Sequence, residues 1–328
     1  MQAISASKLK SLQECSYKFY CEYILKLPKK ANDGARRGQV VHSLYECLLK
    51  DKRKKYYKEI ILKQSIKGIP VIERFIKGKM KREGLTTADN KKQNNFELID
   101  QMILVGLLYD FYCEGGKVEE AETAFEYSNK QIGYTIRGII DKISKQDGKL
   151  KIWDYKTSAK KYEAQDLKSN YQAMMYSLYA KRVRKMDAIV NFVFLRFPDQ
   201  PIQEVIFDKD VLNGFEQYLG FINNYLENFS LEEAYSNFAA NKPYPKNGEW
   251  GGPLICGYGK WPGHQNKKGD EYYVCPFKWS FEYYVLLDKE STKVIKSAFN
   301  KNELKPSKKQ IVEQRWYAGC PKFSVNSS

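Results

Sequence analysis

The sequence predicts an α/β fold, formed either as one large domain or as two small ones, and three observations support this. The chain has 328 residues, which is enough to bury a sizeable core. Segments with helical spacing of apolar residues occur both before and after a group of strand-like segments. Between two of those strand-like segments, Asp147-Gly148 is a strong signal for a two-residue β-hairpin.

Two helices are expected near the N-terminus. Ser5 and Ser7 are good N-cap residues for the first helix. The apolar side chains of its buried face have helical spacing: Leu12, Cys15, Phe19 and Tyr23. The second helix is expected over residues 38–49. Its inward face is formed by Val40, Val41, Leu44 and Leu48.

Residues 51–112 form a charged and lysine-rich region that we expect to be helical. Pro70 is expected to break it, because proline lacks the backbone N–H that a helix interior needs. The region is interpreted as an insertion into the core or as a lid.

The predicted hairpin places two aspartates opposite each other. If Asp147 and Gly148 form the turn, counting outward along both strands makes Asp141 face Asp154. Side chains alternate along a strand, so each aspartate interrupts an otherwise apolar face. Lys156 lies on the same face, one pleat further along the second strand.

The facing carboxylates of Asp141 and Asp154 would repel each other, and burial would strengthen the repulsion. A shared proton or a bound cation is the usual relief. A divalent metal held by two aspartates, with a lysine beside them, is an arrangement that cleaves phosphodiesters. The alternative is that one aspartate faces solvent, because a register slip of one residue would move it to the other face.

The remaining strands and helices of the core surround the hairpin in the sequence. Strand signals begin at residues 122–127 and continue into the hairpin. After it we expect a helix over residues 165–184, a strand over 188–196, a short strand over 203–207 and an amphipathic helix over 209–228.

The character of the sequence changes near Asn241. Proline and glycine become frequent, which indicates a loop-rich stretch, and a strand-like run over residues 281–287 and a basic tail follow. We therefore expect a core domain over residues 1–235 and a C-terminal appendage over residues 236–328, packed on the core.

The chain is strongly basic, with 55 Lys and Arg against 39 Asp and Glu and a formal net charge of +16. A surplus of this size favours a polyanionic partner, and nucleic acid is the commonest one. The alternative is a lysine-rich proteome encoded by an AT-rich genome. Aromatic residues interleaved with lysines suit stacking on the bases of a single strand, although most of them are expected in the core.

The sequence favours a cytoplasmic location, in a cell or in a phage-infected host. No segment reaches the roughly 18 apolar residues that span a membrane, and the N-terminus lacks the apolar region of a signal peptide. The seven cysteines show no CxxC pair. In a reducing compartment they are interpreted mostly as buried free thiols.

Four motifs follow one another along the chain, each on the element type expected for it. They are Gly38-x-x-x-His42 on a helix, Gly138-x-x-Asp141 on a strand, Asp154-Tyr155-Lys156 on its partner strand and Gln172-x-x-x-Tyr176 on the next helix. In this order they resemble the PD-(D/E)xK nuclease superfamily. The nearest likeness is to its RecB-like branch, which includes AddB-type nuclease domains and CRISPR-associated exonucleases. Ser5-x-Ser7-x-Leu9 followed by Cys15 is similar to the N-terminal signature of that branch.

The resemblance implies a fold and a metal site. The fold is a restriction-endonuclease-like core, in which a mixed central β-sheet is flanked by helices. Asp141 and Asp154 would be the acidic ligands of Mg²⁺ or Mn²⁺, with His42 and the backbone carbonyl of Tyr155 as further ligands. Lys156 would position or activate the attacking water. The alternatives are that His42 has a purely structural role and that Lys156 is an ordinary surface lysine.

Gln172 and Tyr176 are four residues apart and therefore share one face of a helix. In proteins of the branch that this chain resembles, this helix touches the nucleic acid, so the resemblance implies a DNA-binding role for both residues. The alternative is that they are ordinary helix-surface residues. Glu126, on the preceding strand, is expected to face solvent rather than to join the metal site.

Many proteins of this branch bind a [4Fe–4S] cluster through one N-terminal and three C-terminal cysteines. Cys15 stands where the N-terminal ligand would be, and Cys256, Cys275 and Cys320 would be the other three. In the family these last three lie close together and include a CxxC, whereas here the gaps are 19 and 45 residues. This departure favours buried thiols, or ordinary packing in place of a lost cluster, over a bound cluster.

We therefore expect a metal-dependent DNA nuclease, in the first place an exonuclease that hydrolyses phosphodiester bonds with a metal-activated water. The alternatives are a non-catalytic DNA-binding or assembly protein on the same fold, and a structure- or sequence-specific endonuclease. The sequence contains no phosphate-binding loop of an ATP motor. A helicase or recombination protein would therefore be a separate partner. Composition and size favour a stand-alone nuclease of phage or mobile-element origin.

Overall fold

The computed structural model describes residues 3–49, 55–85, 94–111, 117–241, 256–257 and 272–323. The chain divides into two compact units, and each is described by itself. Unit 1 consists of Met1–Ala6 and Ala31–Glu227, and unit 2 of Ser7–Lys30 and Asn228–Ser328. This division differs from the expected one, because residues 7–30 belong with the C-terminal part of the chain.

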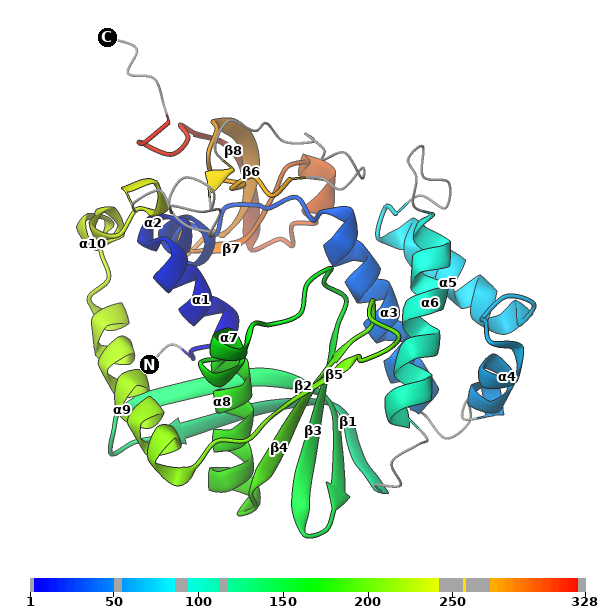
Figure 1. Cartoon of the computed structure of the whole chain (residues 1–328). Helices are drawn as coiled ribbons and strands as arrows, with labels where there is room; N and C mark the ends of the chain where they lie inside the picture. Colours follow the sequence, from blue (N-terminus) through cyan, green and yellow to red (C-terminus); the bar gives the residue numbers. More distant parts are fainter. Residues whose placement is uncertain are drawn as a thin grey trace. The chain divides into compact units, whose positions relative to one another are not determined.

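Unit 1 is built on a five-stranded sheet in the order β1-β2-β3-β4-β5 (Figure 1). The strands are β1 (Lys117–Asn129), β2 (Tyr134–Gln146), β3 (Lys149–Lys156), β4 (Ala188–Phe194) and β5 (Ile202–Val205). Neighbouring strands are antiparallel except β3 and β4, which run parallel. The mixed sheet with its flanking helices confirms the fold class expected from the sequence.

β2 and β3 form the hairpin that the sequence predicts. Asp147 and Gly148 form the turn, with φ values of 49° and 73°. These left-handed values are the ones that a two-residue type I′ turn requires. The strands pair in the expected register as far as Lys142–Trp153, one step before Asp141 and Asp154. Backbone pairing therefore stops at the position of the two aspartates.

The connection from β3 to β4 contains two α-helices, α7 (Ala164–Lys168) and α8 (Tyr171–Tyr179). From residue 173 to its end, every residue of α8 is buried. The helix contacts β2 and β4 and also α9 (Lys209–Glu227), which lies beside it in Figure 1. Because the sheet and α9 both cover it, α8 has the almost continuously apolar sequence of a buried helix.

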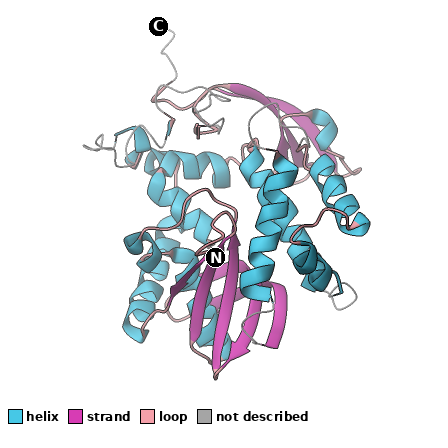
Figure 2. Ribbon diagram, turned by 45° about the vertical axis from the view of Figure 1, so that its right-hand side comes forward, coloured by secondary structure: helices cyan, strands magenta, loops and turns pink. Residues whose placement is uncertain are grey.

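A second group of helices packs on the sheet in unit 1, where Figure 2 shows the strands between helices. It comprises α3 (Asp33–Leu49), α4 (Lys55–Lys63), α5 (Pro70–Arg82) and α6 (Asn95–Gly106). Their buried side chains share one hydrophobic core with Trp153 and Tyr155 of β3 and Val193 of β4. By strand alternation, these side chains point to the face opposite that of Asp154.

The lysine-rich region 51–112 contributes to this core with its described helices. Pro70 begins α5, where its missing N–H costs no helical hydrogen bond. Ile72, Ile76 and Met80 follow on the buried face of α5. The described part of the region thus shares the hydrophobic core of unit 1.

Unit 2 joins an N-terminal and a C-terminal stretch in one core. Its helices are α1 (Ala6–Glu14), which begins at the last residue of unit 1, α2 (Ser16–Phe19) and α10 (Leu231–Ser236). Its antiparallel sheet has the order β7-β6-β8, with β6 at Phe281–Asp288, β7 at Val294–Ala298 and β8 at Gln310–Tyr317. β6 was expected from the sequence, whereas β7 and β8 were not.

The packing of α2 explains why residues 7–30 belong to unit 2. The ring of Tyr17 stacks on that of Phe238, with 5.2 Å between centroids. Ser16 Oγ donates a hydrogen bond to the carbonyl of Ala234 (2.9 Å) and accepts one from the backbone N–H of Asn237 (3.0 Å). The buried neighbours of α2 thus come from the C-terminal part of the chain.

None of the helices in the described ranges combines the length and the apolar character that a membrane crossing requires. α9 has 19 residues, and its sequence includes Lys209, Asp210, Glu216 and Glu227. Charged side chains are costly at the centre of a bilayer.

Candidate functional site

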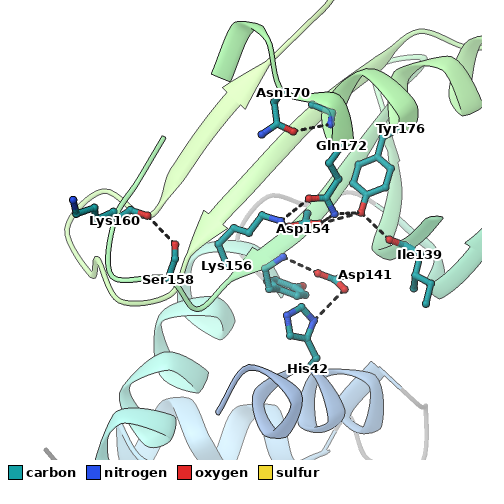
Figure 3. A network of polar contacts seen from close by, with 12 residues as sticks. His42, Ile139, Asp141, Asp154, Lys156, Ser158, Lys160, Asn170, Gln172 and Tyr176 are labelled. Carbon is teal, nitrogen blue, oxygen red and sulfur yellow. Dashed lines mark hydrogen bonds and ion pairs between the residues drawn. The ribbon is translucent and has the colours of Figure 1, made fainter. Parts of the chain in front are cut away.

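Asp141 lies where the pairing of β2 with β3 ends, and its two oxygens contact two different elements (Figure 3). Oδ2 accepts a hydrogen bond from the backbone N–H of Tyr155 on β3 (2.7 Å). Oδ1 lies 3.1 Å from Nδ1 of His42 on α3. The carboxylate therefore accepts the hydrogen bond of a β3 backbone N–H that no longer pairs with β2. With its other oxygen it contacts the helix that carries His42.

His42 is carried by α3, one helical turn after Gly38. A Cβ at Gly38 would lie 3.0 Å from Oγ1 of Thr157, so the glycine leaves room for the end of β3 beside α3. Burial alone would lower the pKa of His42, but the hydrogen bond to Asp141 and the charges of Asp141 and Asp154 outweigh it and raise the pKa. In this environment the imidazole takes up a proton more readily than a free histidine.

Asp154 is almost completely buried, with 4% of its surface exposed. Its Oδ1 accepts a hydrogen bond from Nε2 of Gln172 (2.6 Å), and Nζ of Lys156 lies 2.6 Å from its Oδ2. Burial raises the pKa of Asp154; the charge of Lys156 opposes this effect and that of Asp141 adds to it. A buried carboxylate beside a second one depends on nearby cations, and Lys156 is one of them.

Lys156 is held by several contacts at the edge of the site. Besides its pairing with Asp154, Nζ donates a hydrogen bond to Oε1 of Gln172 (2.6 Å) and lies 5.1 Å from the centre of the Phe192 ring. Burial would lower the pKa of Lys156, but the charge of Asp154 outweighs it and raises the pKa. The side chain is 20% exposed, so Lys156 places a positive charge at the edge of the site.

Gln172 and Tyr176 lie one turn apart on α8 and orient the residues of β3 (Figure 3). Gln172 contacts both Asp154 and Lys156 and so holds them together. The hydroxyl of Tyr176 lies 2.7 Å from the carbonyl oxygen of Ile139 and 3.0 Å from Asp154 Oδ1, and it can donate to either. Tyr176 is only 2% exposed, so the structure does not support the DNA contact expected for it. It positions Asp154 from the buried side of α8.

Glu122 on β1 belongs to the same cluster and was missed by the sequence analysis. It offers one potential metal-ligand atom, as do His42 and Asp141, and these three atoms lie within 4.8 Å of one another. Burial raises the pKa of Glu122 to about 7, and the charge of Asp141 adds to the effect. Glu126, which the sequence analysis considered on this strand, is exposed as expected. The sequence signal for Glu122 was no more than the acidic character of the segment.

The glycine of the motif Gly138-x-x-Asp141 makes room for an aromatic ring. A Cβ at Gly138 would lie 2.7 Å from the ring of Phe125 on β1. This ring packs against Tyr176 and Tyr179 of α8, with centroid distances of 6.0 and 4.8 Å. Gly138 thus allows the packing that keeps Tyr176 beside the site.

Four cysteines that are far apart in the sequence line one pocket of unit 2. They are Cys15, Cys256, Cys275 and Cys320. All four are free thiols. Burial raises the pKa of Cys256 to about 11 and that of Cys275 to about 12, and the other cysteines of the pocket add to both shifts. The fold thus brings together the four cysteines that the resemblance singled out, although 19 and 45 residues separate the last three.

A buried lysine lines the same pocket. Lys278 is 4% exposed. In the described part of the chain, its Nζ contacts the carbonyl oxygen of Gly257, at 3.3 Å, and the rings of Trp279 and Phe323. None of these groups carries a negative charge. A positive charge in such a place is stabilised by a negative one nearby, and cysteines that ligate a metal centre are deprotonated to thiolates.

The donor set of this pocket fits an iron–sulfur cluster, which is held by four cysteine thiolates. A single zinc ion would draw the sulfurs to roughly 4 Å from one another, because Zn–S bonds are about 2.3 Å long. Cys15, Cys256, Cys275 and Cys320 offer the four thiolates that an iron–sulfur cluster requires.

Similar proteins are found among bacterial helicase–nuclease subunits. The chain is 28% identical over 172 residues to a subunit of the ATP-dependent helicase/deoxyribonuclease of Streptococcus equi subsp. zooepidemicus; the match covers 49% of this chain and 14% of that protein. It is 24% identical over 254 residues to the identically named subunit from Streptococcus agalactiae serotype III, covering 74% and 22%. The chain therefore spans less than a quarter of the length of these curated relatives.

The family comparison covers most of the chain. A solved structure of a proposed exonuclease from Eubacterium rectale aligns with 74% of this chain and 90% of its own, with a TM-score of 0.44 and 11% identity. The sequence model described as the PD-(D/E)XK nuclease superfamily matches residues 3–240, which include every motif on which the resemblance was based. The chain belongs to the PD-(D/E)XK nuclease superfamily.

Proposed function

We propose that this chain is a deoxyribonuclease that depends on Mg²⁺ or Mn²⁺ and degrades DNA from its ends. One observation carries the proposal. The carboxylates of Asp141 and Asp154 gather with His42 and Lys156 where the pairing of β2 with β3 ends. Membership of a nuclease superfamily supports phosphodiester hydrolysis as the reaction of this site.

The side chains present fit a hard divalent cation. Asp141 and Asp154 offer oxygens and His42 a nitrogen, a set that suits Mn²⁺ as well as Mg²⁺. Tyr155 would add its backbone carbonyl, and its ring anchors that backbone, being 2% exposed and 4.5 Å from the ring of Tyr45. When bound, such a cation lowers the pKa of a water and stabilises the charge that develops at phosphorus.

Lys156 would act by its charge rather than as a base. Its raised pKa keeps the ammonium protonated, and a general base must be able to accept a proton near the working pH. Held by Asp154 and Gln172, the ammonium would offset the charge of the scissile phosphate and orient the attacking water. Tyr176 would keep Asp154 in place for this task.

DNA as the substrate and a helicase as the partner are supported by the names of similar proteins, which are subunits of ATP-dependent helicase/deoxyribonucleases. The residues of this chain include no phosphate-binding loop, so ATP hydrolysis would come from elsewhere. The net charge of +16 favours a polyanionic substrate. DNA binding should therefore weaken as the salt concentration rises.

We further propose that Cys15, Cys256, Cys275 and Cys320 hold a [4Fe–4S] cluster. The pocket that they share and the buried Lys278, which has no acidic partner among the described residues, support this assignment. The four ligands would connect the N-terminal stretch of unit 2 to three positions in its C-terminal part. The contribution would be structural, because the free energy of binding a metal centre adds to that of folding.

The nuclease is tested with end-labelled linear DNA, single- and double-stranded, incubated with the full chain and Mn²⁺. Wild type is compared with Asp154→Asn and with Asp199→Asn, which changes an exposed aspartate outside the site. We expect wild type and Asp199→Asn to degrade the DNA and Asp154→Asn to leave it intact. Equal degradation by all three proteins would refute the site, and degradation in EDTA would refute the metal dependence.

A circular single strand distinguishes the two modes of cleavage, because it has no ends. An exonuclease leaves the circle intact, whereas an endonuclease opens it. If wild type binds DNA in Ca²⁺ but degrades neither linear nor circular strands in Mn²⁺, the chain is a non-catalytic DNA-binding protein on this fold.

A further inference from the structure

Three carboxylates stand side by side across β1, β2 and β3. The pairing of the residues on either side puts Glu122 opposite Asp141. The hairpin register puts Asp154 opposite Asp141 on its other side. Asp154 is held by Lys156 and by two neutral donors of α8, whereas Glu122 and Asp141 lie beside His42. The row of carboxylates thus has two ends with different surroundings.

The backbone of β1 is distorted where Glu122 joins this row. The register of β1 on β2 shifts between Val118 and Glu120. Two residues later, Glu122 adopts a left-handed conformation with φ of 46°, which glutamate rarely occupies. A bulge followed by such a residue re-aims side chains relative to the regular alternation of a strand.

We propose that Glu122 is a ligand of the catalytic cation, together with His42 and Asp141. This proposal rests on the nuclease function proposed above, because that function is what makes the cation catalytic. The three ligand atoms lie within 4.8 Å of one another, and ligands about 2.1 Å from a small divalent ion are roughly 3–4 Å apart. Oδ1 of Asp141 is the oxygen on this side, because Oδ2 accepts the hydrogen bond from Tyr155.

The charges around Glu122 favour a cation over a structural ion pair. The described charged groups with the largest effect on it are Asp141, His42, Glu46 and Asp154. Three of these four groups are acidic, and the fourth must be neutral to ligate a metal. A carboxylate in such surroundings is stabilised by a bound cation, for which the imidazole and the carboxylates supply the ligand atoms.

Glu126 gives a matched control on the same strand. It is exposed, and in the register of β1 on β2 it pairs with Arg137, away from the site. Changing either glutamate to glutamine removes one negative charge and keeps the size of the side chain. Any difference in Mn²⁺ binding between the two variants therefore results from the position of Glu122 and not from the loss of a charge in general.

The test is the binding of Mn²⁺ to the full chain without DNA, measured by isothermal titration calorimetry. We expect Glu122→Gln to weaken Mn²⁺ binding by about 10-fold or more, and Glu126→Gln to bind like wild type. The Mn²⁺ concentration for half-maximal DNA cleavage should rise by a similar factor in Glu122→Gln. Melting curves in EDTA show whether the variants are folded. Glu122→Asp, which keeps the charge but shortens the reach, should also bind Mn²⁺ more weakly than wild type.

The outcomes separate this inference from the nuclease function. Equal Mn²⁺ affinity of Glu122→Gln and Glu126→Gln, in a wild type that cuts DNA, would overturn the ligand role of Glu122 and leave the nuclease in place. Weakened Mn²⁺ binding in Glu122→Gln, in a wild type that does not cut DNA, would support the ligand role and refute the nuclease. A wild type that binds no Mn²⁺ would refute both.

Discussion

Unit 1 gathers negative side chains where backbone pairing in its sheet ends, whereas unit 2 gathers thiols beside a buried cation. In unit 1, Asp141 and Asp154 are both nearly buried, and His42 and Lys156 offset their charge in part. In unit 2, Lys278 is buried without a negative partner among the described residues. The first site is therefore suited to a cation, and the second to an anionic centre with thiolate ligands.

The two sites also differ in how the chain assembles them. Asp141, Asp154 and Lys156 lie on the two strands of one hairpin, whose register depends on the turn and on alternation. Cys15 and Cys320 come from opposite ends of the chain and meet through the packing of α2 on the C-terminal part. Residues can therefore meet in three dimensions even where their spacing along the chain departs from the family pattern.

The largest effect is expected at Asp141, where a substitution should impair the site of unit 1 and leave that of unit 2 unchanged. Asp141→Asn should lower the rate of DNA cleavage by at least about 10²–10³-fold, since it removes a charge from the site. The iron content should stay at the wild-type level. Asparagine keeps an acceptor for the N–H of Tyr155, so thermal melts in EDTA should show a folded protein. Initial rates on labelled DNA and thermal melts measure both effects; a variant that cuts at the wild-type rate would contradict the assignment.

The next prediction concerns the cysteine pocket. Cys320→Ala should lose the bound iron and acid-labile sulfide of anaerobically purified protein, together with the visible absorbance of an iron–sulfur cluster. The control is Cys47→Ala, which changes a cysteine of α3 in unit 1 that is also buried, with 6% exposed. It should retain iron, sulfide and colour. Wild-type protein without iron, or equal iron in both variants, would show that the pocket holds free thiols.

A smaller effect is expected from pH, because His42 has a raised pKa in the folded chain. Its protonation stabilises the folded state fully below its ordinary pKa of 6.5, and this contribution is lost as pH rises through the raised pKa. In EDTA, the melting temperature of wild type relative to His42→Gln should therefore fall as pH rises above 6.5. Mn²⁺ must displace the same proton, so its affinity should rise over this window. A difference in melting temperature that does not change with pH would contradict the pairing of His42 with Asp141.

The smallest effect is expected at Lys278. Lys278→Met removes a buried positive charge and keeps most of the side-chain volume, so the cluster should remain bound while its reduction potential falls. The physical reason is that a nearby cation stabilises the more negative, reduced state of the cluster. Potentiometric titration followed by electron paramagnetic resonance measures the shift, with the exposed Lys301→Met of unit 2 as the control. Equal potentials in both variants would place Lys278 outside the electrostatic environment of the cluster.

Individual residues show where sequence reasoning reaches its limit. The pairing of β2 with β3 was predictable because a two-residue turn and the alternation of side chains fix a register locally. The place of Glu122 was not, because the shift in β1 and a left-handed residue break that alternation. The sequence of α8 is that of a buried helix, but it does not identify the sheet and α9 as the elements that cover Tyr176.

The α/β class, the hairpin and the order of the motifs that place the chain in its superfamily can all be read from the amino-acid sequence. These features depend on turn residues and on the periodicity of neighbouring side chains, which act over short distances along the chain. The meeting of Cys15 with Cys256, Cys275 and Cys320, and that of Glu122 with His42 and Asp141, emerge only when the chain is folded. Such groupings arise when buried faces of distant segments pack together, and an apolar face in a sequence does not specify its partner.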